Sequence, residues 1–346
     1  TLVEMLGYAR LIQVHKVPAL PLPVTCVINE SIPARRIQER GGQTFGEFAP
    51  SYRPADTLVG HLRFALRYEG LNLQVLKLLF DRLGGDEIRA ALIEQPESAI
   101  ARRLAFLFEW LTKQYLDIPE GHSGRRQYVA VLDEKLQFGM QRRKPVRNEK
   151  FRVIDNLPGT PAFCPLVRRT AYLQRMSQKG LAQLAAAKLA GYDRQLLLRA
   201  AGYLYLKETQ SSFEVEREKP SASRAQRFAD LLQESEAGHE LTMERLVDLQ
   251  NAVVDHRFQE ASWRQTQNWL GQDLGYRKKV AFVPPRPEDV HSLMDGLMAM
   301  SHRLRDAHLE MKQATANDSL AIDPVVAAAS ISFGFVFIHP FLDGNG

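Results

Sequence analysis

Apolar positions in the N-terminal half of the chain recur at the spacing of helices. The segment from Asp56 to Leu79 carries leucines at such spacings, and so does the segment from Ala99 to Leu116. A stripe of this kind is buried within its own domain more often than it docks a partner, so we expect core helices here. The segment 18–28, PALPLPVTCVI, is instead kept extended by its three prolines.

The C-terminal half is helical over longer stretches. Residues 181–219, 222–234 and 242–258 contain no proline, and Thr242 is placed to accept the free amide hydrogens of a first helical turn. A further helical pattern runs over residues 288–311. We therefore expect a mainly α fold.

The helical period is lost in residues 262–282. Gly271 and Gly275 permit a turn there, and the segment Lys279–Val283, KVAFV, favours an extended conformation. The proline-rich stretch VPPRP follows and ends it. We expect a β-hairpin at this point.

A change of composition divides the chain. Residues 139–169 are first basic and then rich in proline and glycine, with a turn-prone Pro158-Gly159 pair. We expect a mostly helical N-terminal domain of unknown role over residues 1–165 and a second domain over residues 166–346. The basic cluster favours a solvated linker over a nucleic-acid surface, because no aromatic residues are interleaved with it.

The composition is that of a globular protein. Hydrophobic residues make up 45% and charged residues 25% of the 346 residues, which excludes a disordered or low-complexity chain. No apolar run reaches the roughly 18 residues of a membrane helix, and TLVEMLGYAR at the start lacks the layout of a signal peptide. We therefore expect a cytoplasmic protein with no membrane partner. The two cysteines, Cys26 and Cys164, suggest neither a disulfide framework nor a zinc site.

The charge changes the picture only a little. The chain has 45 Lys and Arg against 40 Asp and Glu, a net charge of +5. This mild excess fits a phosphate-bearing ligand, and it falls well short of the charge of a nucleic-acid-binding protein.

Strong start and stop signals frame the last helix. Asp323 can cap the first turn, and Pro324 fits the first helical position, where no N–H is needed. The following VVAAASISFGFVFI is apolar nearly all round, which predicts a helix buried in the middle of the domain. Pro340 pushes the residue before it out of the helical region, so His339 should end the helix and face the next loop.

The loop that follows, FLDGNG, combines three chemical groups with this histidine. Gly344, Asn345 and Gly346 can adopt positive φ, which lets their backbone N–H groups converge on an anion such as phosphate. Asp343 supplies an oxygen ligand beside that cradle, as proteins hold Mg²⁺. His339 can accept a proton near neutral pH. The sequence thus predicts a base, a metal ligand and a phosphate cradle within one short segment.

The string HPFLDGNG, which begins at His339, resembles the signature of the Fic family, His-Pro-Phe-x-Asp-Gly-Asn-Gly, at every position. FVPPRPEDVHSLMDGLM resembles the segment that follows the hairpin called the flap in this family, and DPVVAAASISFGFVFIHPF resembles the helix that delivers the signature. The resemblance covers about residues 180–346 and implies an all-helical Fic bundle interrupted by a β-hairpin flap. Because the family's signature continues with two arginines beyond Gly346, we expect a trimmed chain, with the Fic domain truncated after GNG.

This resemblance implies a protein adenylyltransferase that moves AMP from ATP onto a Tyr, Thr or Ser hydroxyl of a target protein. His339 would take the proton of that hydroxyl, and Asp343 would hold the Mg²⁺ that bridges the α and β phosphates. Phe341, with Pro340, would anchor the loop in the core. The phosphates would be bound by the last three residues: Gly344, Asn345 and Gly346.

The segment from Ser212 to Glu216, SFEVE, resembles the family's inhibitory motif, in which a Ser or Thr precedes a Glu by four positions. Residues four apart share a helix face, so Ser212 can position Glu216 toward the nucleotide. In the family this glutamate pairs with the second signature arginine and obstructs the γ-phosphate. Arg217 stands where the family has Gly or Asn, Glu214 is the alternative inhibitory residue, and a solvated charged face is the alternative interpretation.

By the same resemblance the flap presents a strand edge to the target, whose hydroxyl would thereby be aligned with His339. A plain hairpin fits these residues equally well. The docking residues would be Lys279, Val280, Ala281, Phe282 and Val283.

Two other functions stay open from the sequence. One is the reverse reaction, removal of AMP, in which the glutamate orients water. The other is a nucleotide-sensing regulatory module that acts on DNA or a protein partner through the rest of the chain. The sequence also leaves open whether the protein forms a homo-oligomer.

Overall fold

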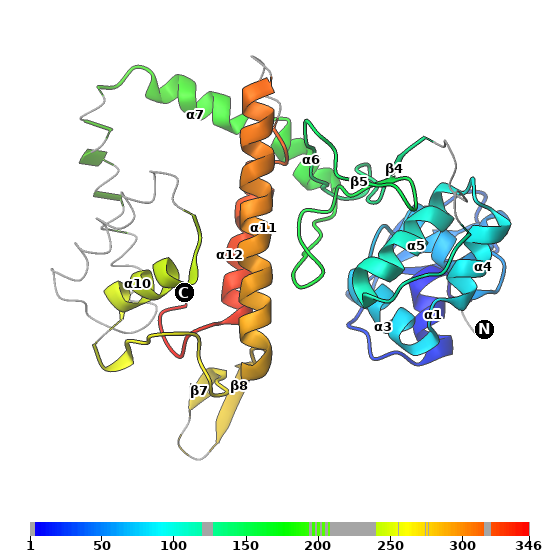
Figure 1. Ribbon diagram of the computed structural model, residues 1–346, viewed down its shortest axis with the longest axis horizontal. Coiled ribbons are helices and arrows are strands. Elements are labelled where there is room, and N and C mark those ends of the chain that lie inside the picture. The colour runs from blue at the N-terminus through cyan, green and yellow to red at the C-terminus, as the bar shows by residue number, and fades with distance from the viewer. Residues whose placement is uncertain are drawn as a thin grey trace. The chain divides into compact units, whose positions relative to one another are not determined.

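The computed structural model divides the chain into two compact units, which are coloured along the chain in Figure 1. The first unit comprises Thr1–Leu157 and Leu166–Arg169, and the second comprises Pro158–Pro165 and Thr170–Gly346. The structure describes these residues: 4–119, 127–193, 196, 197, 199, 200, 203, 204, 207, 240–254, 256–273, 275, 277–314 and 320–345.

The first unit is built mainly on five helices. Three of them begin with a side-chain cap in which Thr57, Asn72 or Ser98 accepts a hydrogen bond from the amide three residues later. The helices are α1 (Gly7–His15), α2 (Leu58–Tyr68), α3 (Leu73–Leu83), α4 (Asp86–Glu94) and α5 (Ala99–Thr112), and a 3₁₀ turn covers Pro50–Tyr52.

The helical pattern from Asp56 to Leu79 forms two helices. The structure ends α2 at Tyr68 and starts α3 at Leu73. Gly70 lies between them with φ 84°, a left-handed conformation that no helix contains. The run over residues 99–116 forms helix α5 only as far as Thr112, where Lys113 ends the helix in a left-handed conformation.

The first unit also contains two small sheets that the hydrophobic pattern does not predict. One has the order β1-β3-β2, with β1 parallel and β2 antiparallel to β3, and the other has the order β4-β6-β5. Their strands are β1 (Thr25–Ile28), β2 (Arg36–Arg40), β3 (Gln43–Phe48), β4 (Val129–Ala130), β5 (Arg147–Asn148) and β6 (Val153–Ile154).

In its described residues, the second unit is a helical bundle with one hairpin. Thr242 caps α10 as expected, accepting from the amide of Arg245. The helices are α6 (Ala171–Ser177), α7 (Leu181–Leu189), α10 (Met243–Val253), α11 (Pro287–Ala314) and α12 (Pro324–Ile338), with a 3₁₀ turn at His256–Phe258. The long helix α11 runs beside α12 (Figure 1). Together with α10 they enclose a core: Leu246, Trp263, Val290, Met294, Leu297, Ile338 and Phe341.

Helix α12 begins and ends where the sequence predicts. The carboxylate of Asp323 accepts from the amides of Val325 and Val326, and the helix stops at Ile338. The expectation that α12 is buried on all sides is wrong for the part of the chain that the structure describes. Its buried residues fall on one line four residues apart, whereas Val325 and Phe333 are 73% and 65% exposed. Composition alone does not reveal how many faces a helix packs.

The predicted hairpin is present. Strands β7 (Leu270–Asp273) and β8 (Lys278–Phe282) pair antiparallel, and β8 is largely exposed. The hairpin projects from the end of α11 at which that helix begins (Figure 1). The ring of Phe282 lies 5.4 Å from the ring of Phe337, which joins the hairpin to α12.

The prediction of a mainly α protein is confirmed, and the described part of the second unit consists of helices and one β-hairpin. Among the described residues, none of the helices combines the length and the apolar character that crossing a bilayer requires.

We predict that Gly334→Val destabilises the second unit by about 1–3 kcal/mol, because overpacking forces neighbouring side chains off their rotamers. Gly334 is where α12 packs closely, and a Cβ there would lie 2.4 Å from the Phe163 ring and 2.6 Å from Leu297 Cδ1. Urea unfolding followed by circular dichroism measures the change. Gly191→Val, at a site with nothing within 4 Å of a Cβ, is the control. Equal midpoints for the two variants would contradict the packing argument.

Candidate functional site

His339 ends helix α12 in a left-handed conformation, with φ 53° and ψ 63°. Its backbone N–H still donates to the carbonyl of Phe335, at 2.9 Å. A non-glycine residue in this region carries a modest steric cost, and such residues gather at functional sites. The turn takes the chain out of the helix and into the loop that follows.

The end of α12 is held by one buried guanidinium. Arg264 is 2% exposed, and its Nε donates to the carbonyl of His339 at 2.7 Å while one Nη2 bond reaches the carbonyl of Ile338 at 3.4 Å. The backbone N–H of Arg264 donates to the carbonyl of Pro340 at 2.7 Å. A cation placed at the carbonyl end of a helix is favoured by the helix dipole. Arg264 therefore fixes the backbone on both sides of His339.

The same guanidinium reaches the base of the hairpin. Its Nη2 donates to the carbonyl of Pro285 at 2.5 Å, and its Nη1 donates to the carbonyl of Thr266 at 3.1 Å. Pro285 lies between β8 and α11. Arg264 thus links the end of α12 to the segment that carries the hairpin.

The loop after His339 closes on itself. The Oδ1 of Asn345 accepts from the amide of Phe341 at 2.9 Å, and its Nδ2 donates to the carbonyl of Phe341 at 2.9 Å. Asn345 is 4% exposed and Phe341 is fully buried, with its ring 5.3 Å from the ring of Trp263. A doubly bonded amide and a buried ring give the loop a fixed shape.

Asp343 and Gly344 form the outer part of the loop. The Oδ1 of Asp343 accepts from the amide of Gly344 at 2.8 Å. Gly344 has φ 76°, and a Cβ there would lie 2.6 Å from Val254 Cγ1, so only glycine fits this turn. Gln250 on α10 supports the turn from below, donating to the carbonyl of Asp343 at 3.3 Å.

A second carboxylate stands at this loop. The Oε1 of Glu260 accepts from the amide of Leu342 at 2.7 Å. Burial raises the pKa of Glu260, and the neighbouring charge of Asp343 acts in the same direction. Two carboxylates therefore lie beside the loop amides, and neither is neutralised by an ion pair among the described residues.

The imidazole of His339 is half-buried, and its Nδ1 is buried without a hydrogen-bond partner in the described part of the chain. Burial lowers the pKa of His339 below its ordinary value, against the nearby carbonyl of Val336. The Arg264 cation lowers it further, and Asp343 opposes that effect. The ring is thus kept neutral near pH 7, which is the form that accepts a proton.

The donor set at the loop fits a hard cation of the magnesium type. The Oδ2 of Asp343 makes no hydrogen bond within the described residues, so it is free to bind a metal ion. No group of three or more His, Cys, Asp or Glu side chains gathers as a metal site in that part of the chain. A single carboxylate suits Mg²⁺, which commonly takes its other ligands from water and from substrate phosphates.

Residues 240–346 match the Fic/DOC family model. This part of the chain is a Fic/DOC family domain. Domains of this family are mostly transferases that act on nucleotides and proteins. No curated protein matches the chain. The match begins just before α10, so it covers the core, the hairpin and the signature loop.

The Fic domain brings most of the predicted site residues together. His339, Asp343, Gly344 and Asn345 lie in one turn, with Pro340 and Phe341 buried beneath it. The side chain of Asn345 is turned into the loop, where it closes the backbone. The predicted docking residues lie on or next to β8. Several predicted residues lie outside the described residues: Ser212, Glu214, Glu216 and Gly346.

Sequence reasoning missed Arg264 and Glu260. Arg264 contacts His339 across 75 positions, and Glu260 contacts Leu342 across 82. The only local signal is that Arg264 follows Trp263 in a segment without helical period. A charged residue next to a core aromatic residue indicates that the charged side chain is buried, but it does not indicate which groups that side chain binds.

We predict that the pKa of His339 lies below 6.5, its ordinary value. As pH falls, this ring should therefore stay neutral to a lower pH than a free imidazole does. Imidazole NMR titration measures it, with the His339 signal assigned by its loss in His339→Ala. Arg264→Met should raise the pKa more than Arg264→Lys, because only lysine keeps the positive charge. Equal pKa values in the two variants would contradict the role of that charge.

Proposed function

We propose that this Fic domain is a protein adenylyltransferase, which uses ATP and Mg²⁺ to attach AMP to a Tyr, Thr or Ser hydroxyl of a target protein. One observation carries the proposal. His339, kept neutral by burial, stands at the end of α12 directly before a rigid loop with a free carboxylate oxygen on Asp343. A base beside a phosphate and metal site is what nucleotidyl transfer requires.

In the proposed reaction the target hydroxyl oxygen attacks the α-phosphorus of ATP in line. The new O–P bond forms as the bond from the α-phosphorus to the bridging oxygen breaks, and pyrophosphate leaves. His339 takes the proton of the hydroxyl. General-base help of this kind is worth on the order of 10² to 10⁴ in rate. Positioning of the two reactants supplies much of the remainder.

Asp343 would hold Mg²⁺, which neutralises charge on the α and β phosphates when it is bound. The backbone of Gly344, Asn345 and Gly346 would bind phosphate oxygens. The present contacts support this assignment, because loop amides already bind anionic oxygens. The amide of Gly344 donates to Asp343 and the amide of Leu342 donates to Glu260. Phosphate oxygens are acceptors of the same kind.

The hairpin would receive the target. Strand β8 is exposed along Lys279, Val280 and Ala281, so an extended segment can add to it by backbone hydrogen bonds. Phe282 and Val283 lie nearest its junction with α11. Because Arg264 joins this junction to the carbonyl of His339, a segment docked there would be held at a set distance from the base.

Restraint of the enzyme by Glu216, positioned by Ser212, is proposed from the sequence alone. A carboxylate near the γ-phosphate would repel the triphosphate and favour an unproductive pose. Removing that side chain should then release the activity.

We predict that Glu216→Gly raises incorporation of label from α-³²P-ATP and that His339→Ala lowers it by about 10²-fold or more. The protein is incubated with labelled ATP and Mg²⁺, and with a bacterial extract as target source, and the gel is read by autoradiography. Chelation of Mg²⁺ should abolish the label. His291→Ala, on the exposed face of α11, is the matched control and should label as the unaltered protein does.

Unchanged labelling in both Glu216→Gly and His339→Ala would refute adenylyl transfer by this site. If the protein instead releases AMP from a pre-labelled target, in a metal-dependent way, the reverse reaction is the activity. A label that resists chelation would remove Asp343 from the proposed metal role.

Glu260 allows a test of nucleotide binding that does not depend on turnover. Glu260→Gln keeps an acceptor for the amide of Leu342 and removes a negative charge beside the proposed phosphate site. We predict tighter binding of ATP with Mg²⁺ by roughly fivefold, about 1 kcal/mol, because like-charge repulsion is removed. Calorimetric titration measures it. Glu260→Ala removes both the charge and the hydrogen bond to the amide of Leu342. Comparing it with Glu260→Gln therefore distinguishes the effect of the charge from the effect of that hydrogen bond on the loop. Weaker binding in Glu260→Gln would show that this carboxylate helps to hold the cation.

A further inference from the structure

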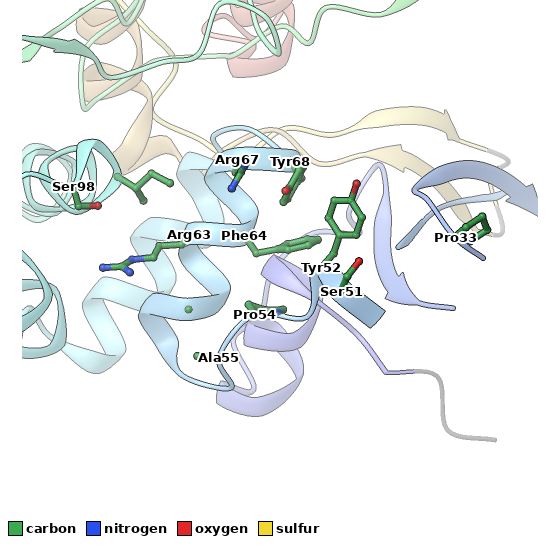
Figure 2. Close-up of a pocket in the computed structure, with 12 residues that line it drawn as sticks. Pro33, Ser51, Tyr52, Pro54, Ala55, Arg63, Phe64, Arg67, Tyr68 and Ser98 are labelled. Carbon is green, nitrogen blue, oxygen red and sulfur yellow. The ribbon is translucent and has the colours of Figure 1, made fainter. Parts of the chain in front are cut away.

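The first unit contains a cavity of about 680 Å³. It lies between α2, the start of α5 and the segment that precedes α2, as Figure 2 shows. Two arginines and three aromatic residues line it, together with small residues, two serines, two prolines and Ile100. No Asp or Glu lines the described cavity, so its charge is positive.

Two arginines give the cavity this charge. Arg63 and Arg67 are four residues apart on α2 and so share one helix face. The Nε of Arg63 is buried and has no hydrogen-bond partner in the described part of the chain. A buried polar atom without a partner is uncommon in proteins, and a bound ligand is one explanation. Neither arginine forms an ion pair with a described residue.

Some other arginines of the first unit, in contrast, form ion pairs with carboxylates. Arg10 pairs with Asp56, and Arg53 pairs with Glu4. Arg36 also pairs, with the buried Glu47. Several cations of this unit are thus matched by a carboxylate, whereas the two that line the cavity face only neutral groups. Arg63 and Arg67 therefore have no carboxylate partner among the described residues.

Aromatic rings line the cavity beside these cations. The rings of Phe64 and Tyr68 lie 4.9 Å apart, and those of Tyr52 and Tyr68 lie 5.7 Å apart. The guanidinium of Arg67 lies 5.3 Å from the Tyr68 ring centroid. Figure 2 shows Phe64, Tyr52 and Tyr68 gathered on one side of the two arginines. A flat apolar group can stack here while an attached anion reaches the guanidinium groups.

The first turn of α5 adds to the anion-binding character. Ser98 and Ile100 line the cavity, and Ser98 caps this helix of 14 residues. Free backbone N–H groups at the start of a helix attract negative charge. Ser51 and Tyr52 also line the cavity, and each carries a hydroxyl group that can donate a hydrogen bond.

We propose that this cavity binds a phosphate ester of an aromatic group, with the phosphate on Arg63 and Arg67 and the flat ring against Tyr52, Phe64 and Tyr68. Bidentate guanidinium contacts suit phosphate geometry. A mononucleotide and a phosphorylated tyrosine both offer this chemistry. The site lies within the first unit and is independent of the reaction proposed for the Fic domain.

Phenyl phosphate is the probe that tests the shared chemistry. Its binding to the whole protein is followed by NMR of the arginine Nε resonances. Arg63→Met and Arg67→Met should each weaken binding by about tenfold or more, since each loses a charge-assisted contact. Arg82→Met, an exposed arginine in the last turn of α3, is the control and should bind normally. Arg67 is exposed, so its substitution is expected to leave folding intact, and thermal unfolding checks this.

Three comparisons decide the outcome. Phenyl phosphate should bind more tightly than inorganic phosphate, and Tyr68→Leu should remove most of that difference. AMP and O-phosphotyrosine are tested in parallel to identify the source of the ligand. The compound that binds more tightly, and whose binding is weakened by Arg63→Met, indicates the natural ligand. Binding of phenyl phosphate that is unchanged in both arginine variants would overturn the site. Equal binding of phenyl phosphate and inorganic phosphate would overturn the aromatic part of the proposal.

Discussion

The carbonyl end of helix α12 is the point on which the candidate active site depends. A helix leaves its last carbonyl groups without internal partners, and here that end is close to the domain core. Arg264 supplies the missing donors to Ile338 and His339 from its side chain, and its backbone serves Pro340. Burying a guanidinium costs free energy, and several hydrogen bonds to carbonyls offset that cost. The loop can be rigid because the helix end beneath it is satisfied.

The loop beyond His339 has a shape of its own before any ligand arrives. Phe341 fills the core, and Asn345 bonds both backbone groups of Phe341. A preformed loop loses little conformational entropy on binding and presents its polar groups in fixed directions. The arrangement also leaves negative charge at the loop, from Asp343 and Glu260. In the proposed reaction, Mg²⁺ held at Asp343 would offset part of that charge.

Local signals explain what the sequence could predict. The bounds of α12 follow from Asp323 and Pro340, each of which acts on its immediate neighbours. The hairpin follows from glycines and a lost helical period. The division between α2 and α3 depends on Gly70, whose left-handed conformation becomes evident only in three dimensions. The β1-β3-β2 sheet and the contacts of Arg264 join residues that are distant in sequence, so no local pattern encodes them. The exposed face of α12 was missed because an apolar stretch does not reveal how many neighbours it has.

One guanidinium holds the carbonyl of Pro285, at the foot of the hairpin, and the carbonyl of His339. Neither carbonyl can shift without straining or breaking its hydrogen bond to Arg264, which also holds the other carbonyl. A shift at the foot of the hairpin would therefore reach the backbone of His339 through a rigid planar group, without passing through the 28 residues of α11. The foot of the hairpin and the backbone of His339 are thus mechanically coupled at a single side chain.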